Sequence, residues 1–287
     1  LIMNQNICFL KEVLSIHTVS YEETLMVEYI VSFLKKNNIE YYVDSFSNVY
    51  ATKQTTTELP NDFYFPCVVA HTDTVHSIET INIFEDVRLN SQSQLKPSLY
   101  ALNGKGAPTG IGGDDKCGVF ACLSLLLDVP DLKAAFFVSE EVGCIGSLNA
   151  DKSFFENVGY AIQFDAPGNW MISEYCSGVQ LFDRDSEFFD KCNIILTENM
   201  DNKLMKYMSN PYTDVYALKQ KFDFSCINFS IGYYKYHTKH EYVVIDDVFN
   251  GIKIGKLMIE RLGNNLHKKK VFKSDLFFDF GKINLIN

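Results

Sequence analysis

The chain has 287 residues, enough for one large domain or two small ones. Hydrophobic residues make up 47% of it and aromatic residues 14%, which is typical of a compact protein with a substantial core. A formal net charge of -10 disfavours partners such as nucleic acid and anionic lipid. The run Lys268-Lys269-Lys270 is therefore expected to be a solvated surface rather than a phosphate site.

The eight cysteines include no Cys-x-x-Cys pair, and a core of this size needs no disulfide bonds. We expect most of them to be buried thiols in a reducing compartment. No stretch approaches the roughly 18 uninterrupted apolar residues of a membrane span. The start of the sequence also lacks the charged-then-apolar pattern of a secretory signal. These features predict a cytoplasmic protein with no membrane partner.

Two helices are predicted at the beginning of the chain. Ile7, Leu10 and Leu14 fall on one face of the first helix. Ser20 and Glu23 have the spacing of a capping box, in which the Ser side chain and the Glu side chain each bond a free amide. The second helix is therefore expected to begin at this pair and to end near residues 37–38.

From residue 40 onwards, short apolar runs alternate with longer amphipathic runs. The expected strands are residues 40–43, 48–52, 65–70, 134–139, 160–164 and 227–232, and the expected helices are residues 117–127 and 246–261. This alternation predicts an α/β fold with a mixed, mostly parallel central sheet and helices on both faces. No linker or repeat divides the chain, so a single domain over residues 1–287 is expected. Its tail, residues 263–287, contains a stretch (271–280) that fits an edge strand or a partner contact.

Acidic and imidazole residues recur where the predicted elements meet. They are His71 and Asp73 after strand 65–70, Asp114 and Asp115 before helix 117–127, Glu140 and Glu141 after strand 134–139, Asp165 after strand 160–164, and His237 and His240 after strand 227–232. The carboxyl ends of parallel strands form the edge where ligands bind. One such residue alone would usually be structural, but five features at five different exits predict a functional site.

These residue types suit a pair of divalent ions. Such a pair needs imidazole and carboxylate ligands, with one carboxylate bridging metals roughly 3.5–4 Å apart. Asp73 lies two residues from His71, on the same side of an extended backbone, so its carboxylate is expected to accept the second imidazole N–H. Glu140 and Glu141 point to opposite sides, so that one can bind metal while the other faces a bound water. The pattern predicts a two-metal hydrolase.

Four motifs, "HTDTVH", "GGDDKCG", "SEEVG" and "YHTKHEYV", resemble those of the co-catalytic zinc exopeptidases. This superfamily includes peptidase T-like aminotripeptidases, zinc aminopeptidases and aminoacylase-type hydrolases, and the resemblance covers nearly the whole chain. It implies the phosphorylase/hydrolase-like zinc-exopeptidase architecture. It also implies a metallo-exopeptidase that removes N-terminal residues from small peptides through a metal-activated water. Two divalent ions are implied, zinc by default, with cobalt or manganese as alternatives.

The resemblance also implies a role for each matching residue. Asp114 would bridge both ions, His71 and Asp165 would complete the first site, and Glu141 and His237 the second, while Glu140 would be the general base and acid and Asp73 would orient His71. His240 competes with His237, but the family pattern His-Thr-x-x-Glu favours His237. A cis peptide bond is expected between Asp114 and Asp115. His17 and His76 are expected to have no role, and Asp214 is left unassigned.

The chain departs in one respect from the superfamily that it resembles. Members of the superfamily insert a lid or dimerisation domain, and neither the interval from Asp73 to Asp114 nor that from Asp165 to His237 has room for one. A bare catalytic domain is therefore expected, and the oligomeric state stays open. Two alternatives also stay open. One is an N-acyl amino-acid deacylase or carboxypeptidase on the same fold, and the other is a non-catalytic binding relative.

Overall fold

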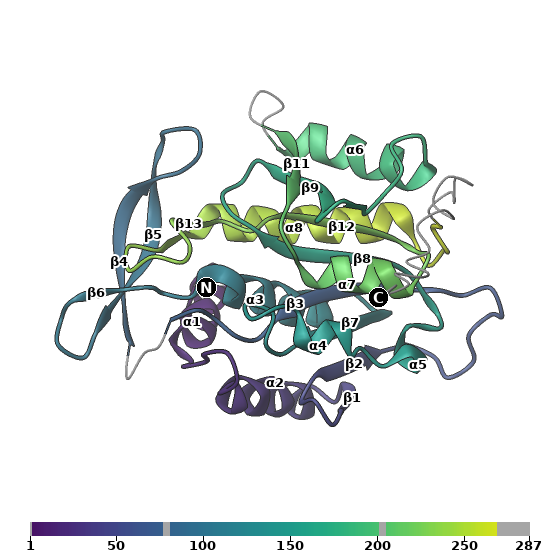
Figure 1. The fold of residues 1–287 in the computed structure, drawn as a ribbon, viewed down its shortest axis with the longest axis horizontal. Coiled ribbons are helices and arrows are strands. Elements are labelled where there is room, and N and C mark those ends of the chain that lie inside the picture. The colour runs from purple at the N-terminus through teal and green to yellow at the C-terminus, as the bar shows by residue number, and fades with distance from the viewer. Residues whose placement is uncertain (1, 77–80, 201–204, 269–287) are drawn as a thin grey trace, which may run out of the picture.

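The computed structural model describes residues 2–76, 81–200 and 205–268. A nine-stranded sheet runs through the molecule in the order β1-β2-β7-β3-β8-β12-β9-β10, with β11 paired to β9 (Figure 1). Its strands are β1 (Glu40–Val43), β2 (Val49–Lys53), β3 (Phe65–His71), β7 (Leu132–Phe137), β8 (Val158–Ala166), β9 (Met171–Cys176), β10 (Val179–Gln180), β11 (Lys206–Asn210) and β12 (Ser225–Ser230). The four central strands, β7, β3, β8 and β12, are mutually parallel, and antiparallel pairs flank them. The expected mixed sheet is confirmed.

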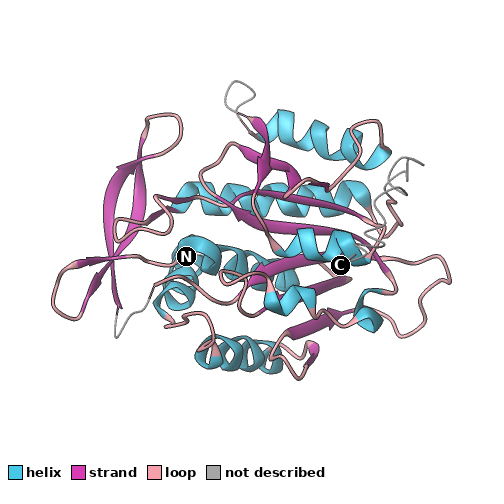
Figure 2. Cartoon of the chain, viewed as in Figure 1, coloured by secondary structure: helices cyan, strands magenta, loops and turns pink. Residues whose placement is uncertain are grey.

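Helices cover both faces of this sheet (Figure 2). They are α1 (Ile2–Ser15), α2 (Thr24–Lys36), α3 (Gly113–Asp128), α4 (Ile145–Leu148), α5 (Lys152–Phe155), α6 (Glu187–Asn199), α7 (Asp214–Lys221) and α8 (Ile245–Leu262). Successive side chains of a strand point to opposite faces. On β8, Phe164 meets α8, where a side chain added at Gly255 would lie 2.6 Å from its ring. Its neighbour Gln163 accepts a hydrogen bond from Val215 of α7. These two helices therefore lie on opposite faces.

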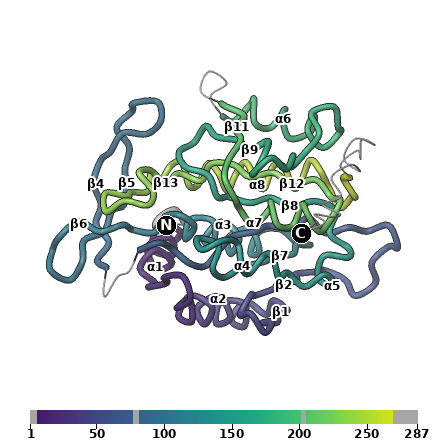
Figure 3. Tube along the Cα trace, viewed as in Figure 1, coloured from purple at the N-terminus to yellow at the C-terminus, as the bar shows by residue number. Residues whose placement is uncertain are grey.

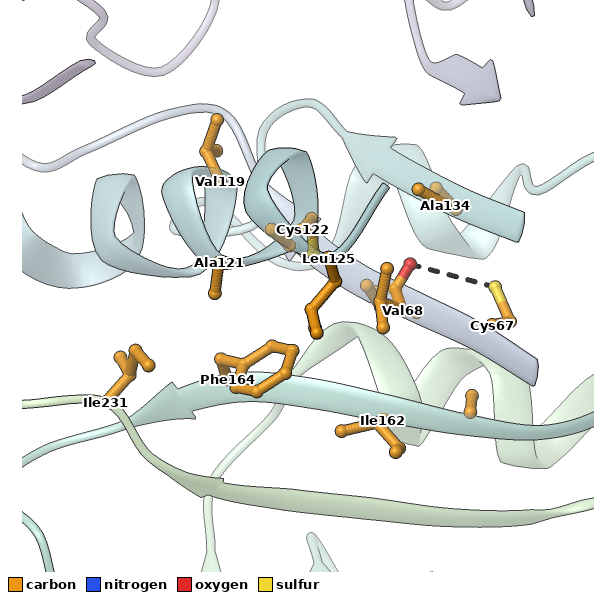
Figure 4. Close-up of a cluster of buried hydrophobic side chains, with 14 of the residues drawn as sticks. Cys67, Val68, Val119, Ala121, Cys122, Leu125, Ala134, Ile162, Phe164 and Ile231 are labelled. Atoms are coloured by element: carbon orange, nitrogen blue, oxygen red, sulfur yellow. Dashed lines mark hydrogen bonds between the residues drawn. The ribbon is translucent and has the colours of Figure 1, made fainter. Parts of the chain in front are cut away.

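The main core lies between the sheet and α3. Val68 of β3, Phe164 of β8 and Leu125 of α3 are fully buried and project toward one another (Figure 4). The central strands are buried along their whole length, as expected for parallel strands covered on both faces. Truncating a buried phenylalanine such as Phe164 to alanine costs about 3–5 kcal/mol, because the cavity collapses only partly. All eight cysteines are free and seven are buried, which confirms the expectation of mostly buried thiols.

A second, smaller sheet stands off one end of the molecule, on the left of Figure 1. Its strands are β4 (Ile81–Leu89), β5 (Leu95–Asn103), β6 (Pro108–Thr109), β13 (Tyr233–Tyr234) and β14 (Tyr242–Val244). The hairpin β4–β5 pairs in antiparallel register from Ile81 opposite Asn103 to Leu89 opposite Leu95. The interval between Asp73 and Asp114 therefore forms a β-hairpin arm. Strand β14 pairs with β5 and joins the arm to the later part of the chain.

The capping box expected at Ser20 and Glu23 is wrong. Helix α2 begins at Thr24, and neither side chain caps it. Ser20 Oγ donates instead to Asp73 Oδ2 at 2.7 Å. Glu23 Oε1 accepts from both the backbone N–H and the hydroxyl of Ser139 at 2.9 Å. The side chains of Ser20 and Glu23 thus bond residues distant in sequence instead of the nearby backbone amides that a capping box would engage.

The other expected elements are found with small shifts of their ends. Strand β7 stops at Phe137 instead of continuing to residue 139, and Ser139 has a φ of 55°, which no strand accommodates. Residues 169–222, the least periodic stretch, contain β9, β10, α6, β11 and α7 (Figure 3). The possible edge strand at 271–280 lies outside the described residues. Among the residues that are described, no helix combines the length and the apolarity needed to cross a membrane.

Candidate metal centre and active site

The predicted site residues come together at the carboxyl edge of the central strands. His71 is the last residue of β3, and Asp165 is the penultimate residue of β8. Asp114 lies in the first turn of α3, and the Asp114–Asp115 peptide is cis, as expected. Glu140 and Glu141 follow β7, and His237 lies in the turn between β13 and β14. Three strands of the central sheet, one helix and the β13–β14 turn thus deliver these groups to one place.

Asp114 is the centre of the cluster. Its Oδ1 lies 3.2 Å from Nε2 of His71, and its Oδ2 lies 3.2 Å from Nε2 of His237. One carboxylate therefore presents one oxygen to each imidazole. A ligand atom from each of His71, Asp114 and Glu141 lies within 4.8 Å of the others, which is close enough to share an ion.

Each imidazole also has a further carboxylate beside it. Asp165 Oδ1 lies 3.8 Å from His71 Nε2, and Glu141 Oε1 lies 3.0 Å from His237 Nε2. Glu140 Oε2 is 3.9 Å from His71 Nε2. Glu140 and Glu141 thus turn toward different imidazoles, as their alternating positions suggested, although they lie in a turn and not on a strand. The arrangement gives two similar groups of donors that share Asp114.

Asp73 lies beside His71, but it contacts more groups than the sequence suggested. Its carboxylate Oδ1 lies 3.3 Å from His71 Nδ1, while its backbone carbonyl lies closer to the same nitrogen, at 3.0 Å. The carboxylate also accepts backbone N–H bonds from Glu140 at 2.9 Å and from Glu141 at 3.2 Å. Asp73 therefore orients the imidazole and also fixes the turn that carries both glutamates.

Asp115 is a buried residue whose role the sequence did not reveal. Its Oδ2 accepts the backbone N–H of His71 at 3.2 Å, and its Oδ1 accepts that of Gly118 at 3.0 Å. A Cβ added at Gly118 would lie 2.2 Å from this carboxylate, so only glycine leaves room for it. Asp115 ties the end of β3 to the start of α3 and so fixes the spacing between His71 and Asp114.

Three other residues behind the site were also missed. Tyr233 donates its hydroxyl to Asp165 Oδ1 at 3.1 Å. Gln163 Nε2 lies 3.4 Å from Asp165 Oδ2 and 3.3 Å from Asp214 Oδ2, so it links the two carboxylates. Glu241 is buried beneath Asp114. A signal for Gln163 was present, because it lies two residues before Asp165 and therefore on the same face of the strand.

His76 and His240, two histidines outside the predicted ligand set, differ in their contacts and exposure. His76 Nε2 lies 2.8 Å from Glu241 Oε2, so it takes part in the support of the site although no role was expected for it. His240 is exposed, and its backbone N–H bonds Thr238. The structure brings His237, rather than His240, to Asp114.

Burial and crowded charge shift the pKa values within this cluster. Burial alone would lower the pKa of His71, but the carboxylates of Glu140, Asp114 and Asp165 outweigh it and raise that pKa well above its ordinary value. Burial raises the pKa of Glu140 well above its usual range, against the opposing charge of His71. A carboxyl group with a raised pKa is suited to accepting and returning a proton near neutral pH.

Asp165 and His237 are shifted for related reasons. Burial, aided by the charge of Asp114, raises the pKa of Asp165 to about 7. Hydrogen bonds to Asp114 and Glu141 raise the pKa of the half-exposed His237 to about 10. The shift of His237 reflects the negative charge of the carboxylates beside it, whereas the shift of Asp165 is due first to burial and then to the charge of Asp114. The cluster therefore favours bound cations.

The cavity above these groups is also lined by carboxylates. Its volume is about 240 Å³, and Asp114, Glu140, Glu141, Asp165 and His237 line it together with Gly143, Pro167, the segment 210–213, Tyr233 and Tyr236. No Lys or Arg is among the lining residues. Several carboxylates and imidazoles with no organic cation form a donor set that fits divalent metal ions with N/O ligands.

No protein-family model matches the sequence, and no curated protein matches it. Solved structures do share its fold. The aminopeptidase PepT from Bacillus cereus superposes with a TM-score of 0.71 at 10% identity, over 91% of this chain and 98% of that chain. A tripeptidase from Staphylococcus aureus gives a TM-score of 0.69 at 11% identity, over 90% and 98%.

An aminopeptidase from the archaeon Desulfurococcus kamchatkensis gives a TM-score of 0.61 at 16% identity, over 90% of this chain and 95% of that chain. The similarity extends over nearly the whole chain in each case. The resemblance in fold that the motifs implied is confirmed, and the chain has the α/β fold of these aminopeptidases and tripeptidases.

Proposed function

We propose that the protein is a two-metal hydrolase that removes N-terminal residues from small peptides, as an aminopeptidase or a di- or tripeptidase. The observation that carries this proposal is the position of Asp114, whose two oxygens each lie 3.2 Å from a different imidazole. A carboxylate that presents one oxygen toward each of two imidazoles is suited to bridging a pair of co-catalytic ions.

The donors divide naturally between two ions. His71 and Asp165 would hold one ion, His237 and Glu141 would hold the other, and Asp114 would bridge them. Zinc suits these nitrogen and oxygen donors, and cobalt or manganese also suits them. Ions bound there would lower the pKa of a coordinated water toward about 7 and polarise the peptide carbonyl.

Glu140 is the proposed general base and acid. It lines the cavity but lies farther from the imidazoles than Asp114 or Glu141 does. From its place in the cavity lining, its carboxylate would take a proton from the attacking water and return that proton to the leaving amine. Cys144 Sγ, 3.5 Å from Glu140 Oε1, and the backbone bond from Glu140 to Asp73 hold it in place.

The charge of the cavity favours an aminopeptidase over the two enzymatic alternatives. A carboxypeptidase or an N-acyl amino-acid deacylase binds a substrate carboxylate next to the scissile bond, which calls for a cation there. The cavity lining contains several carboxylates and no Lys or Arg. Because no cationic side chain is present, the lining gives a substrate carboxylate no partner beside the scissile bond. The aminopeptidases and tripeptidases of the same fold also support this choice.

The test combines metal analysis with a substrate panel. The purified protein is loaded with zinc, cobalt or manganese, its metal content is measured, and hydrolysis of a leucine aminoacyl substrate is compared with that of N-blocked peptides. We expect two metal equivalents and chelator-sensitive release of N-terminal residues from unblocked peptides. Cleavage restricted to N-blocked substrates would favour the deacylase, and absence of both metal and hydrolysis would favour the binding relative.

A further inference from the structure

A second cavity lies beside the proposed active site. It has a volume of about 430 Å³ and shares Pro167 and Tyr236 with the lining of the catalytic cavity. One wall comes from the tip of the β4–β5 arm, residues 89–93, and the other from residues 167–170 and 234–242. We call it the aromatic groove. Its volume is within the range of pockets that bind small ligands, about 300–1,000 Å³.

Four aromatic side chains line the groove, and hydrogen bonds hold two of them in place. Trp170, Tyr234, Tyr236 and Tyr242 all line it. The hydroxyl of Tyr234 donates to Asp247 at 2.6 Å, and that of Tyr242 donates to the carbonyl of Leu89 at 2.7 Å. The rings of Tyr234 and Tyr242 stack with their centroids 5.2 Å apart. Because these two hydroxyls are already bonded, the tyrosines offer mainly ring surface to a ligand.

The two cavities differ in charge. No Asp or Glu lines the aromatic groove, and Lys235 is the charged residue in its lining. Within the described part of the chain, Lys235 is exposed and forms no ion pair. The catalytic cavity has no Lys or Arg, and its four carboxylates are those assigned above to the ions and to the general base. The groove therefore offers the C-terminal carboxylate of a short peptide a cationic partner that the lining of the catalytic cavity does not supply.

We propose that the aromatic groove binds the C-terminal part of a short peptide, with its second or third side chain against the aromatic rings and its terminal carboxylate paired with Lys235. This inference rests on the proposed function and adds a subsite to it, one that holds the C-terminal part of the short peptide beyond the scissile bond. An extended peptide advances about 3.3–3.6 Å per residue, so two residues beyond the scissile bond span roughly 7 Å. A groove that begins at the edge of the catalytic cavity suits that length.

Trp170 makes binding in the groove measurable, because it is the single tryptophan of the chain. The probe is the tripeptide Ala-Phe-Ala with its first peptide bond reduced to CH2–NH, so that this bond cannot be hydrolysed. The metal-loaded protein is titrated with this probe as a free acid and as its C-terminal amide, and tryptophan fluorescence is followed. We expect both forms to change the fluorescence and the free acid to bind about fivefold more tightly, as an exposed ion pair allows.

Two variants test whether the preference for the free acid depends on Lys235 itself or on the overall charge of the turn that carries it. Lys235→Glu should remove the preference for the free acid over the amide. Lys239→Glu changes the charge by the same amount in the same exposed turn but outside the groove, and it should retain the preference. An unchanged preference in Lys235→Glu, or a probe that leaves Trp170 fluorescence unaltered, overturns the inference.

Hydrolysis of the unmodified tripeptide distinguishes this inference from the proposed function. For Lys235→Glu we expect KM for the free acid to rise about fivefold with kcat nearly unchanged, while the amide is unaffected. If the wild-type protein cleaves tripeptides and Lys235→Glu has the same KM as the wild type, only the groove assignment fails. If no peptide is cleaved under any metal condition, the proposed function fails, whatever the fluorescence shows.

Discussion

The buried carboxylate of Glu241 holds the backbone of Asp114. Its Oε1 accepts the N–H of Asp114 at 3.1 Å, and its Oε2 accepts the N–H of Gly112 at 2.8 Å. His76 contacts the same Oε2 at 2.8 Å. A residue 127 positions away in the sequence thus fixes the segment that presents the central carboxylate of the site.

Glu241→Ala should weaken metal binding although Glu241 is not itself a proposed ligand. Its loss leaves two buried backbone N–H groups without an acceptor and frees the segment that carries Asp114. Removing a partner that orients a ligand typically costs about 10–100-fold in metal affinity. Chelator competition measures this constant. His240→Ala is the control. This side chain is exposed and directly precedes Glu241, so the variant should bind metal as the wild type does.

Asp114→Ala should remove both ions, because the residue lies between the two imidazoles. Metal analysis after dialysis should find far less than one equivalent, against two in the wild type. Asp62→Ala, at an exposed carboxylate, should keep the full content. Two equivalents retained by Asp114→Ala would refute the bridging role.

Glu140→Gln should keep its metal and lose activity. The amide preserves the size of the side chain but cannot accept the proton of the attacking water. General acid–base catalysis contributes typically about 10²–10⁴-fold, so kcat should fall at least about a hundredfold. Turnover is measured on an unblocked tripeptide, with metal content determined on the same sample. Undiminished turnover with full metal content would exclude Glu140 from this role.

Asp214→Asn should change how the stability of the metal-free protein depends on pH. Burial raises the pKa of Asp214 to about 6, against the opposing charge of His71. The folded state therefore binds the proton of Asp214 more tightly than the unfolded state does. The contribution of Asp214 to the free energy of unfolding is thus favourable at low pH. It is lost as pH rises from the ordinary carboxyl value toward 6 and stays lost above it.

The asparagine variant should therefore be more stable than the wild type at pH 8, by up to about 3 kcal/mol, and should lose that advantage near pH 4. Its side-chain oxygen can still accept the bond from Gln163. Urea unfolding at both pH values measures the difference. Asp62→Asn, at an exposed position, is the control and should show little change at either pH.

Much of the site could be predicted because strand periodicity fixes where side chains emerge. The apolar runs before His71 and Asp165 identified buried parallel strands, and such strands end at one edge of a sheet. His237 was favoured over His240 by the motif alone, and it is His237 that lies against Asp114. The positions at the strand ends required only the order of residues along single elements, whereas the choice of His237 came from the family resemblance.

The support of the site could not be predicted in the same way. Ser20 and Glu23 formed a plausible local cap, yet they bond Asp73 and Ser139, 53 and 116 positions away. Nothing near Glu241 in the sequence indicates that its carboxylate reaches the backbone of Asp114. A buried polar group bonds whichever partner the packed chain brings near, and a local pattern does not contain that information.

The sequence by itself determined the alternation of strands and helices and the residue types at the strand ends, because both follow from periodicity and side-chain chemistry. The resemblance implied Asp114 as the central carboxylate, but only the tertiary structure decided which residues hold it between the imidazoles, and that the β4–β5 arm faces residues 167–170 to form the aromatic groove. The physical reason is that such contacts depend on the packing of segments distant in sequence, whereas periodicity describes one segment at a time.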